Sequence, residues 1–246
     1  MFKKLLYVFI LVGLLASCKT YNHVQSTEVV YESTEGKNYT EDKSISEFIS
    51  PYREDMDKEM GVVIGQMPET LRKSRPNSNM GNWFCDVLLS EAKRTSSRDV
   101  DFAIQNYGGL RIPSVAEGPL KVGTIYELMP FDNLLVILDL NVQQVQMLLD
   151  KIAGSGGWPI SRNITFRIQN GKATDIKIKG ESLGSKKMYR VAMPDYIANG
   201  GDNFDFLVPL PQDNSGNFIR EVVIEHLRLL ADENKPITVD NSKRIF

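Results

Sequence analysis

The chain has 246 residues, of which 42% are hydrophobic and 24% are charged, and its formal net charge is −2 at pH 7. This composition is ordinary for a globular protein, and the length suffices for one substantial domain or two small ones. The near-neutral charge excludes broad charge-driven binding of a nucleic-acid polymer, although it is compatible with a local basic pocket for a phosphorylated small molecule.

Residues 1–18 have the features of a bacterial lipoprotein signal peptide. Lys3 and Lys4 precede an apolar run that is too short to span a membrane and that ends in "LLASC". This ending resembles a lipobox, so we expect cleavage before Cys18 and lipidation of that cysteine. The alternative is an ordinary secretory signal in which Cys18 is incidental. Lipidation implies a protein anchored at a membrane of the bacterial cell envelope, on an extracytoplasmic face, with no spanning helix.

Residues 19–44 are polar and lack helical periodicity, and we interpret them as a flexible tether between the lipid and the folded part. The folded domain is therefore expected to comprise residues 45–246. Cys85 is the remaining cysteine of that domain. The domain consequently has no internal disulfide and depends on its hydrophobic core for stability.

The first half of the domain alternates predicted helices and strands. Ser50 followed by Pro51 has the residue types of an N-cap and a first helical position, which predicts a helix that begins there. "GVVIG" at 61–65 predicts a short buried strand. "NMGNWFCDVLLSEAKR" at 79–94 has apolar residues at helical spacing, and "DVDFAIQ" at 99–105 predicts another strand.

Two capping patterns predict helices in the middle of the domain. Thr124 and Glu127 have capping-box spacing, so a short helix is expected to begin there. The nearly continuous apolar run "NLLVILDL" at 133–140 predicts a strand that is buried on both faces. Asn141 and Gln144 repeat the capping pattern and predict that a second amphipathic helix follows this strand directly.

The last third contains the clearest hairpin signal. Residues 164–180 alternate in polarity on either side of Asn170-Gly171, a pair typical of a two-residue hairpin turn. "DNSGN" at 213–217 is expected to form a polar turn, and residues 217–234 predict a closing amphipathic helix. Because helices and strands interleave around an antiparallel hairpin, the sequence indicates an α+β domain with mixed sheets flanked by helices.

Two glycine-rich stretches of similar composition follow predicted strands. These are "QNYGGLR" at 105–111 and "YIANGGDNF" at 196–204. Glycines there allow another molecule to approach the backbone closely. Loops of this kind can bring together groups suited to a nucleoside: two rings to stack on a base, a carboxylate for ribose hydroxyls, and an arginine for phosphate or sugar oxygens. The candidates are Asn106, Arg111, Phe131, Tyr196 and Asp202.

The chain has few residues of the kind that hold catalytic metals. It contains two histidines, His23 in the tether and His226 in the last predicted helix, and no Cys/His cluster or P-loop. A dinuclear hydrolase site needs several histidines and aspartates held together. We therefore expect no metal and no cofactor in this chain, and no catalytic residue of its own.

The order of four motifs closely resembles the C-terminal substrate-binding domain of the 5′-nucleotidase/UDP-sugar hydrolase family. The motifs are "NYGGLR", "IYELMPFDNLLVILDL", "GGWPIS" and "YRVAMPDYIANGGDNF", and "SNMGNWFCDVLL" matches a helix of that family that begins Asn-x-Gly-Asn. The similarity extends from about residue 45 to about residue 230. It implies a layered α/β/β/α arrangement of the fold.

The resemblance also implies residue roles. Asn106 and Arg111 match family residues that contact the nucleotide, and Asp202 matches the aspartate that binds ribose hydroxyls. Phe131 and Tyr196 match the two aromatic residues that sandwich the base, although the second is often Phe in the family. The glycines and the asparagine of the two loops complete the expected substrate-binding set, namely Gly108, Gly109, Asn199, Gly200 and Gly201.

The chain departs from the family pattern in three places. Arg75 is expected to fill the role of an arginine that precedes the Asn-x-Gly-Asn helix, with Arg72 as the alternative, because the spacing to Asn79 is not regular. Ser161-Arg162 replaces the usual Ser-Gly, which puts the floor of the pocket in question. The metallophosphatase motifs that hold two divalent metals in family enzymes do not occur in this sequence.

The main hypothesis is therefore the nucleotide-recognition half of a split extracytoplasmic 5′-nucleotidase. A separate metallophosphatase chain would then supply the two metals and hydrolyse the phosphate ester. Stand-alone binding of nucleosides or nucleotides is the alternative, and a scaffold that no longer binds ligand is a third reading. A phosphatase that is active without a partner fits the sequence least.

Overall fold

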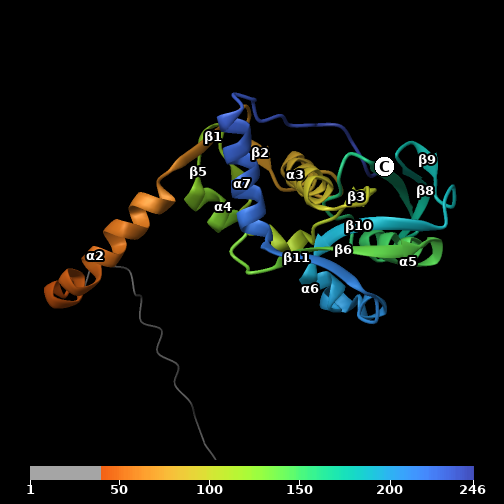
Figure 1. The fold of residues 1–246 in the computed structure, drawn as a ribbon, viewed down its shortest axis with the longest axis horizontal. Helices are drawn as coiled ribbons and strands as arrows, with labels where there is room; N and C mark the ends of the chain where they lie inside the picture. The colour runs from red at the N-terminus through yellow and green to blue at the C-terminus, as the bar shows by residue number, and fades with distance from the viewer. Residues whose placement is uncertain (1–39) are drawn as a thin grey trace, which may run out of the picture. The chain divides into compact units, whose positions relative to one another are not determined.

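A four-stranded mixed sheet, with strand order β11–β6–β10–β3, forms the centre of the fold (Figure 1). Its members are β3 (Phe102–Ala103), β6 (Leu134–Asn141), β10 (Met188–Pro194) and β11 (Gln212–Phe218). β6 pairs antiparallel with both β10 and β11, whereas β10 pairs parallel with β3. The predicted α+β class with mixed sheets flanked by helices is confirmed. The computed structural model describes residues 40–246, of which 47–246 form one unit, so the predicted signal peptide, Cys18 and most of the tether lie outside the described residues.

The central strand β6 is buried on both faces, as its apolar sequence predicts. Leu135 and Ile137 face one hydrophobic cluster, which includes residues of α3 (Asn79–Thr95) and α7 (Ile219–Asp232). Val136, Leu138 and Leu140 face a second cluster, which is built with α5 (Val142–Gly154) and the sheet formed by residues 164–182. In Figure 1, α3 and α5 accordingly lie on opposite sides of β6 and β10. Period-two alternation along one strand thus separates the two halves of the core.

Local capping explains where two of these helices begin. The Ser78 side chain accepts a hydrogen bond from the Gly81 amide at 2.9 Å and caps α3. Asn141 and Gln144 form the predicted capping box at the start of α5, with bonds of 2.9 and 2.8 Å. The short helix α4 (Val122–Leu128) has its N-cap at Lys121, three residues before the predicted N-cap Thr124, and has no side-chain cap.

The prediction that a helix begins at Ser50 and Pro51 is wrong. Helix α2 spans Lys43–Met60 and contains Pro51 in its interior. The Asp42 carboxylate accepts a hydrogen bond from the Ser44 amide at 2.9 Å, so it satisfies an amide of the first turn and starts the helix earlier.

Three smaller sheets complete the part of the chain that the structure describes. β7 (Ile164–Gln169), β8 (Lys172–Ile178) and β9 (Glu181–Ser182) form an antiparallel sheet in that order. Asn170 and Gly171 between β7 and β8 have φ of 50° and 74°, which confirms the predicted hairpin turn. The other two sheets each contain two strands, which are β1 (Val63–Met67) with β5 (Gly118–Lys121), and β2 (Leu71–Arg72) with β4 (Ser114–Val115).

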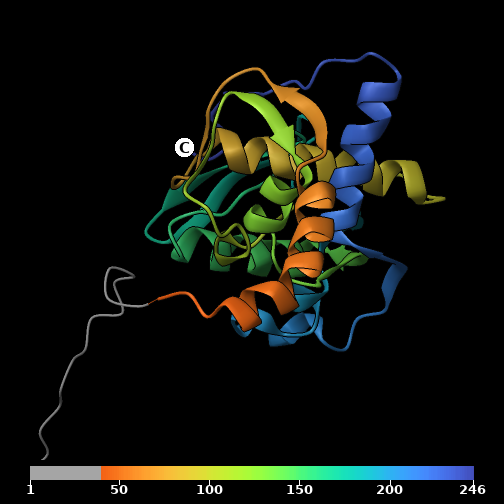
Figure 2. The same ribbon diagram turned by 90° about the vertical axis from the view of Figure 1, so that its left-hand side faces the viewer.

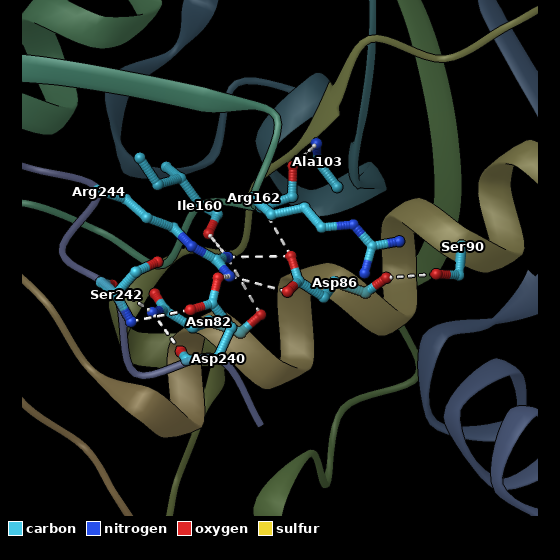
Figure 3. A network of polar contacts seen from close by, with 10 residues as sticks. Asn82, Asp86, Ser90, Ala103, Ile160, Arg162, Asp240, Ser242 and Arg244 are labelled. Carbon is cyan, nitrogen blue, oxygen red and sulfur yellow. Dashed lines mark hydrogen bonds and ion pairs between the residues drawn. The ribbon is translucent and has the colours of Figure 1, made fainter. Parts of the chain in front are cut away.

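The last residues of the chain are tied to α3 by Arg244, whose side chain is 2% exposed (Figure 3). Its guanidinium forms a bidentate pair with Asp86, with bonds of 2.9 and 2.8 Å, and also contacts Asp240 at 2.9 Å and the Ile160 carbonyl at 2.8 Å. Burial lowers the pKa of Arg244, but hydrogen bonds and charge from Asp86 and Asp240 outweigh it and raise the pKa. After Arg244, Ile245 pairs in parallel with Phe166 of β7.

Figure 2 shows α7 upright beside the N-terminal part of the unit, with α3 crossing behind it. Among residues 40–246, no helix is both long and apolar enough to cross a membrane.

Candidate functional site

The topology of the central sheet brings three loops together at one end of its strands. β3 and β10 run parallel, with Ala103 opposite Ala192, so the loops that follow them leave the sheet at the same end. β6 runs antiparallel to β10, with Leu135 opposite Pro194, so the segment that precedes β6 arrives at that end too. The loops after β3 and β10 carry the two glycine-rich stretches, and the segment before β6 carries Phe131.

A cavity of about 300 Å³ lies among these three loops. Seven of the residues expected from the sequence line it together with Asn133, which was not predicted. The seven are Asn106, Gly108, Gly109, Arg111, Phe131, Tyr196 and Asp202.

The two predicted stacking rings stand at the surface of the cavity. Phe131 is 40% exposed and Tyr196 is 43% exposed, whereas the rings of Phe102, Phe204 and Trp158 are buried in the core. The Arg111 guanidinium carbon lies 5.6 Å from the centroid of the Phe131 ring, and one of its nitrogens donates to the Gly108 carbonyl at 3.3 Å. The rings offer stacking faces, and the guanidinium has donors left for an anion.

Asp202 is held at the cavity by contacts to both carboxylate oxygens. The Tyr196 hydroxyl donates to Oδ1 at 3.2 Å, and the Asn106 amide nitrogen lies 3.4 Å from Oδ2. Asp202 belongs to a 3₁₀ turn, η3 (Gly201–Asn203), and has a left-handed backbone with φ of 53°. A carboxylate oriented in this way can accept hydrogen bonds from two neighbouring hydroxyl groups.

Gly109 makes room for the amide pair that orients Asn106. A Cβ atom on Gly109 would lie 2.1 Å from Gln105 Nε2 and 2.6 Å from Asn106 Oδ1. Gln105 is fully buried, and its Nε2 donates to Asn106 Oδ1 at 2.8 Å. Because that oxygen is engaged by Gln105, the Asn106 nitrogen faces Asp202. The sequence did not identify Gln105 as a site residue, because its role depends on this contact and no motif indicates it.

The remaining predicted residues of the second loop shape the loop and do not line the cavity. Gly201 lies under the Tyr196 ring, because a Cβ there would be 2.5 Å from Tyr196 Cζ. Gly200 has φ of 91°, which favours glycine. The Asn199 side-chain oxygen accepts a hydrogen bond from Gln212 Nε2 at 2.8 Å and so joins the loop to β11.

A group of cations surrounds Tyr107, the residue between Asn106 and Gly108. Lys73 Nζ lies 4.1 Å from the Tyr107 ring centroid, and the Arg75 guanidinium carbon lies 4.0 Å from it. Burial together with the positive charges of Arg111 and Arg75 lowers the pKa of Lys73. Such mutual repulsion marks a local positive potential that favours an anion.

This cluster distinguishes the two arginines proposed to precede α3. Arg75 lines a cavity next to the first, with Tyr107, Gly108 and Asp202, whereas Arg72 lines neither of the two. Lys73 was not singled out from sequence, although it lies within a stretch rich in cations.

The loops that carry the rings are fastened to neighbouring helices. The Leu134 amide donates to the Asp195 carboxylate at 3.0 Å, which connects the start of β6 to α6 (Asp195–Ala198), the short helix that carries Tyr196. On the other side, Arg220 at the start of α7 pairs with Asp132 at 2.8 Å. These contacts set the position of both rings.

Arg162 does not form the floor of the cavity of about 300 Å³. Its backbone amide donates to Asp86 at 2.7 Å (Figure 3). Arg162 lines a different cavity, of about 150 Å³, together with Trp83 and His226. The preceding residue, Ser161, is fully buried and accepts a hydrogen bond from the Ala103 amide at 2.9 Å. The departure from the usual Ser-Gly therefore leaves the predicted site unchanged.

The described residues do not fit a two-metal site. Within residues 40–246, no group of three or more His, Cys, Asp or Glu side chains is placed to hold a metal ion. His226 instead contacts Glu91 at 2.8 Å. The arrangement can bind a planar base, hydroxyls and an anion, and it offers no donor set for metal-assisted hydrolysis.

Comparison with known proteins identifies the family to which the folded domain belongs. A sequence model described as "5′-nucleotidase, C-terminal domain" matches residues 61–209. Protein UshA of Escherichia coli is 27% identical over 231 residues, which cover 89% of this chain and 39% of that protein. A 5′-nucleotidase of Vibrio vulnificus is 29% identical over a stretch that covers 81% of this chain and 36% of that protein.

A solved structure shows the same fold. The 5′-nucleotidase precursor of Thermus thermophilus superposes with a TM-score of 0.69 at 26% identity, covering 81% of this chain and 42% of that one. The chain therefore spans about two fifths of the length of the relatives it matches. The family model matches more than half of the chain, so this protein belongs to the 5′-nucleotidase C-terminal domain family.

Proposed function

We propose that this protein is the nucleotide-recognition half of a split extracytoplasmic 5′-nucleotidase. The observation that carries the proposal is the cavity at the sheet edge, where Phe131 and Tyr196 offer exposed rings beside the Asp202 carboxylate and the Arg111 guanidinium. The base would stack on the rings, and Asp202 would accept from the ribose hydroxyls. Arg111, with Lys73 nearby, would bind the 5′-phosphate.

A separate metallophosphatase chain would supply the hydrolytic chemistry. The matched relatives are more than twice as long as the part shared with this chain, and two of the names they carry are those of nucleotidases. Such a partner would contribute the metal ions and the activated water. Lipidation at Cys18 would keep the two chains together at the cell envelope.

The decisive experiment has two stages. First, calorimetry measures binding of adenosine and AMP to the purified chain. Second, phosphate release from AMP is measured with exported metallophosphatases that lack their own C-terminal domain, each with and without this chain. A rate gain that is lost in a Phe131→Ala variant supports the split enzyme.

The alternative, a stand-alone nucleoside- or nucleotide-binding lipoprotein, gives a different result. Binding would then be seen in the first stage, with no rate gain from any partner in the second. Absence of binding in the first stage would refute both. Hydrolysis by the pure chain with divalent metal added would contradict the assignment of recognition alone.

A further inference from the structure

A second cavity, of about 400 Å³, lies next to the proposed nucleoside site and shares Gly108 and Asp202 with it. Gly108 places no side chain between the two cavities, and a Cβ there would meet only Asn106 Nδ2, at 3.9 Å. A ligand held at Asp202 can therefore extend into the second cavity along the protein surface.

The walls of the second cavity combine cations with aromatic rings. Arg75 stacks on Tyr107 at 4.0 Å, and Lys151 Nζ lies 5.4 Å from the centroid of Phe204, which is 1% exposed. Arg75 also donates to the Ser155 carbonyl, which fixes its orientation.

Neither cation is neutralised by a carboxylate. Within the described part of the chain, no Asp or Glu oxygen forms an ion pair with Arg75 or Lys151, whereas the buried Arg244 has two such partners. A ring face attracts a cation weakly and leaves its N–H donors available. These two positive charges can therefore bind an anion that enters from the first cavity.

We propose that the second cavity is a subsite for a second phosphate, attached to the ribose 2′ or 3′ oxygen, with Lys151 and Arg75 as its charged partners. The inference rests on the proposed function, in which Asp202 contacts the ribose hydroxyls. The group next to Asp202 in the second cavity is then a substituent of one of those oxygens, and the other hydroxyl remains for Asp202. The 5′-phosphate stays with Arg111 in the first cavity.

The test compares AMP with ADP and with adenosine 2′,5′- and 3′,5′-bisphosphate by calorimetry at low salt, using the purified full chain. We expect at least one bisphosphate to bind about tenfold or more tightly than AMP. Lys151→Gln should reduce this preference below about threefold and leave AMP affinity within twofold. The matched control is Lys187→Gln, which removes the same charge from an exposed lysine outside both cavities and should preserve the preference.

Each other outcome overturns a specific statement. AMP binding without any preference for a bisphosphate refutes the subsite and leaves the proposed function intact. A preference that persists in Lys151→Gln removes Lys151 from the subsite. Tighter binding of ADP than of either bisphosphate would place the second phosphate on the 5′ chain and contradict the ribose-side assignment. No binding of AMP or of a bisphosphate refutes both the subsite and the function on which it rests.

Discussion

Replacing Tyr196 by Phe tests whether the carboxylate at the site is positioned by this side chain. The substitution keeps the ring, which packs over Gly201, and removes one hydroxyl that donates to Asp202 Oδ1 at 3.2 Å. A hydrogen bond to a charged group contributes about 1.5–3 kcal/mol. Tyr196 is 43% exposed, and the Asn106 contact to Asp202 remains in the variant. We therefore expect the loss of binding free energy to be at or below the lower end of this range. A loss of about 1 kcal/mol corresponds to roughly fivefold weaker binding.

The assay is calorimetric titration of the wild type and Tyr196→Phe with adenosine and with 2′,3′-dideoxyadenosine. The substitution should weaken adenosine binding about fivefold and leave the dideoxy ligand nearly unchanged, because that ligand has no hydroxyl for Asp202. As a control, Phe131→Ala removes a stacking face and should weaken both ligands, by about 1–3 kcal/mol. If Tyr196→Phe weakens both ligands equally, or neither, while the wild type binds adenosine, then the hydroxyl does not act through Asp202.

Three further predictions concern the scaffold. Gly109→Ala places a Cβ 2.1 Å from a buried amide, so calorimetry should show adenosine affinity at least tenfold lower, and unchanged affinity would mean that this amide pair does not orient the site. Arg244→Met leaves the Asp86 carboxylate, 14% exposed, without its partner, and chemical denaturation should show a loss of about 3–5 kcal/mol in the free energy of unfolding; a loss below 1 kcal/mol would contradict this. The pKa of Asp240 is lowered to about 2, because bonds from Ser242 and Arg244 outweigh burial. The ionised carboxylate therefore contributes its full stabilisation above the usual pKa of 3.8 and loses it as the pH falls toward 2. In Asp240→Asn, the free energy of unfolding should change less with pH over this range.

Local patterns predicted the parts of the fold that local physics determines. The capping pair Asn141 and Gln144, the Asn170-Gly171 turn and the doubly buried strand β6 each depend on neighbouring residues or on simple burial. The loop residues of the site were predicted from the order of the motifs and from the family that they resemble. The structure brings seven of them to one cavity because β3 and β10 are parallel neighbours, which the sequence did not predict.

Features that depend on tertiary contacts escaped prediction. Residues 213–217 were expected to form a turn but belong to β11, a polar edge strand that pairs with the backbone of β6 and has an irregularity between Asn214 and Phe218. An edge strand of this kind needs no apolar alternation. Gly108 and Gly109 were expected to permit close approach of another molecule. Neither has positive φ, and the space beside Gly109 is taken by the side chains of Gln105 and Asn106.

The residues that follow the family match determine how this domain can be isolated. The family match ends at residue 209, yet the residues beyond it supply an edge of the central sheet, helix α7 against the core, and the guanidinium that locks Asp86. A fragment trimmed to the matched segment would expose apolar surface on α3 and leave β6 without a neighbour on one side. The segment matched by the family model is therefore shorter than the folded unit, which comprises residues 47–246.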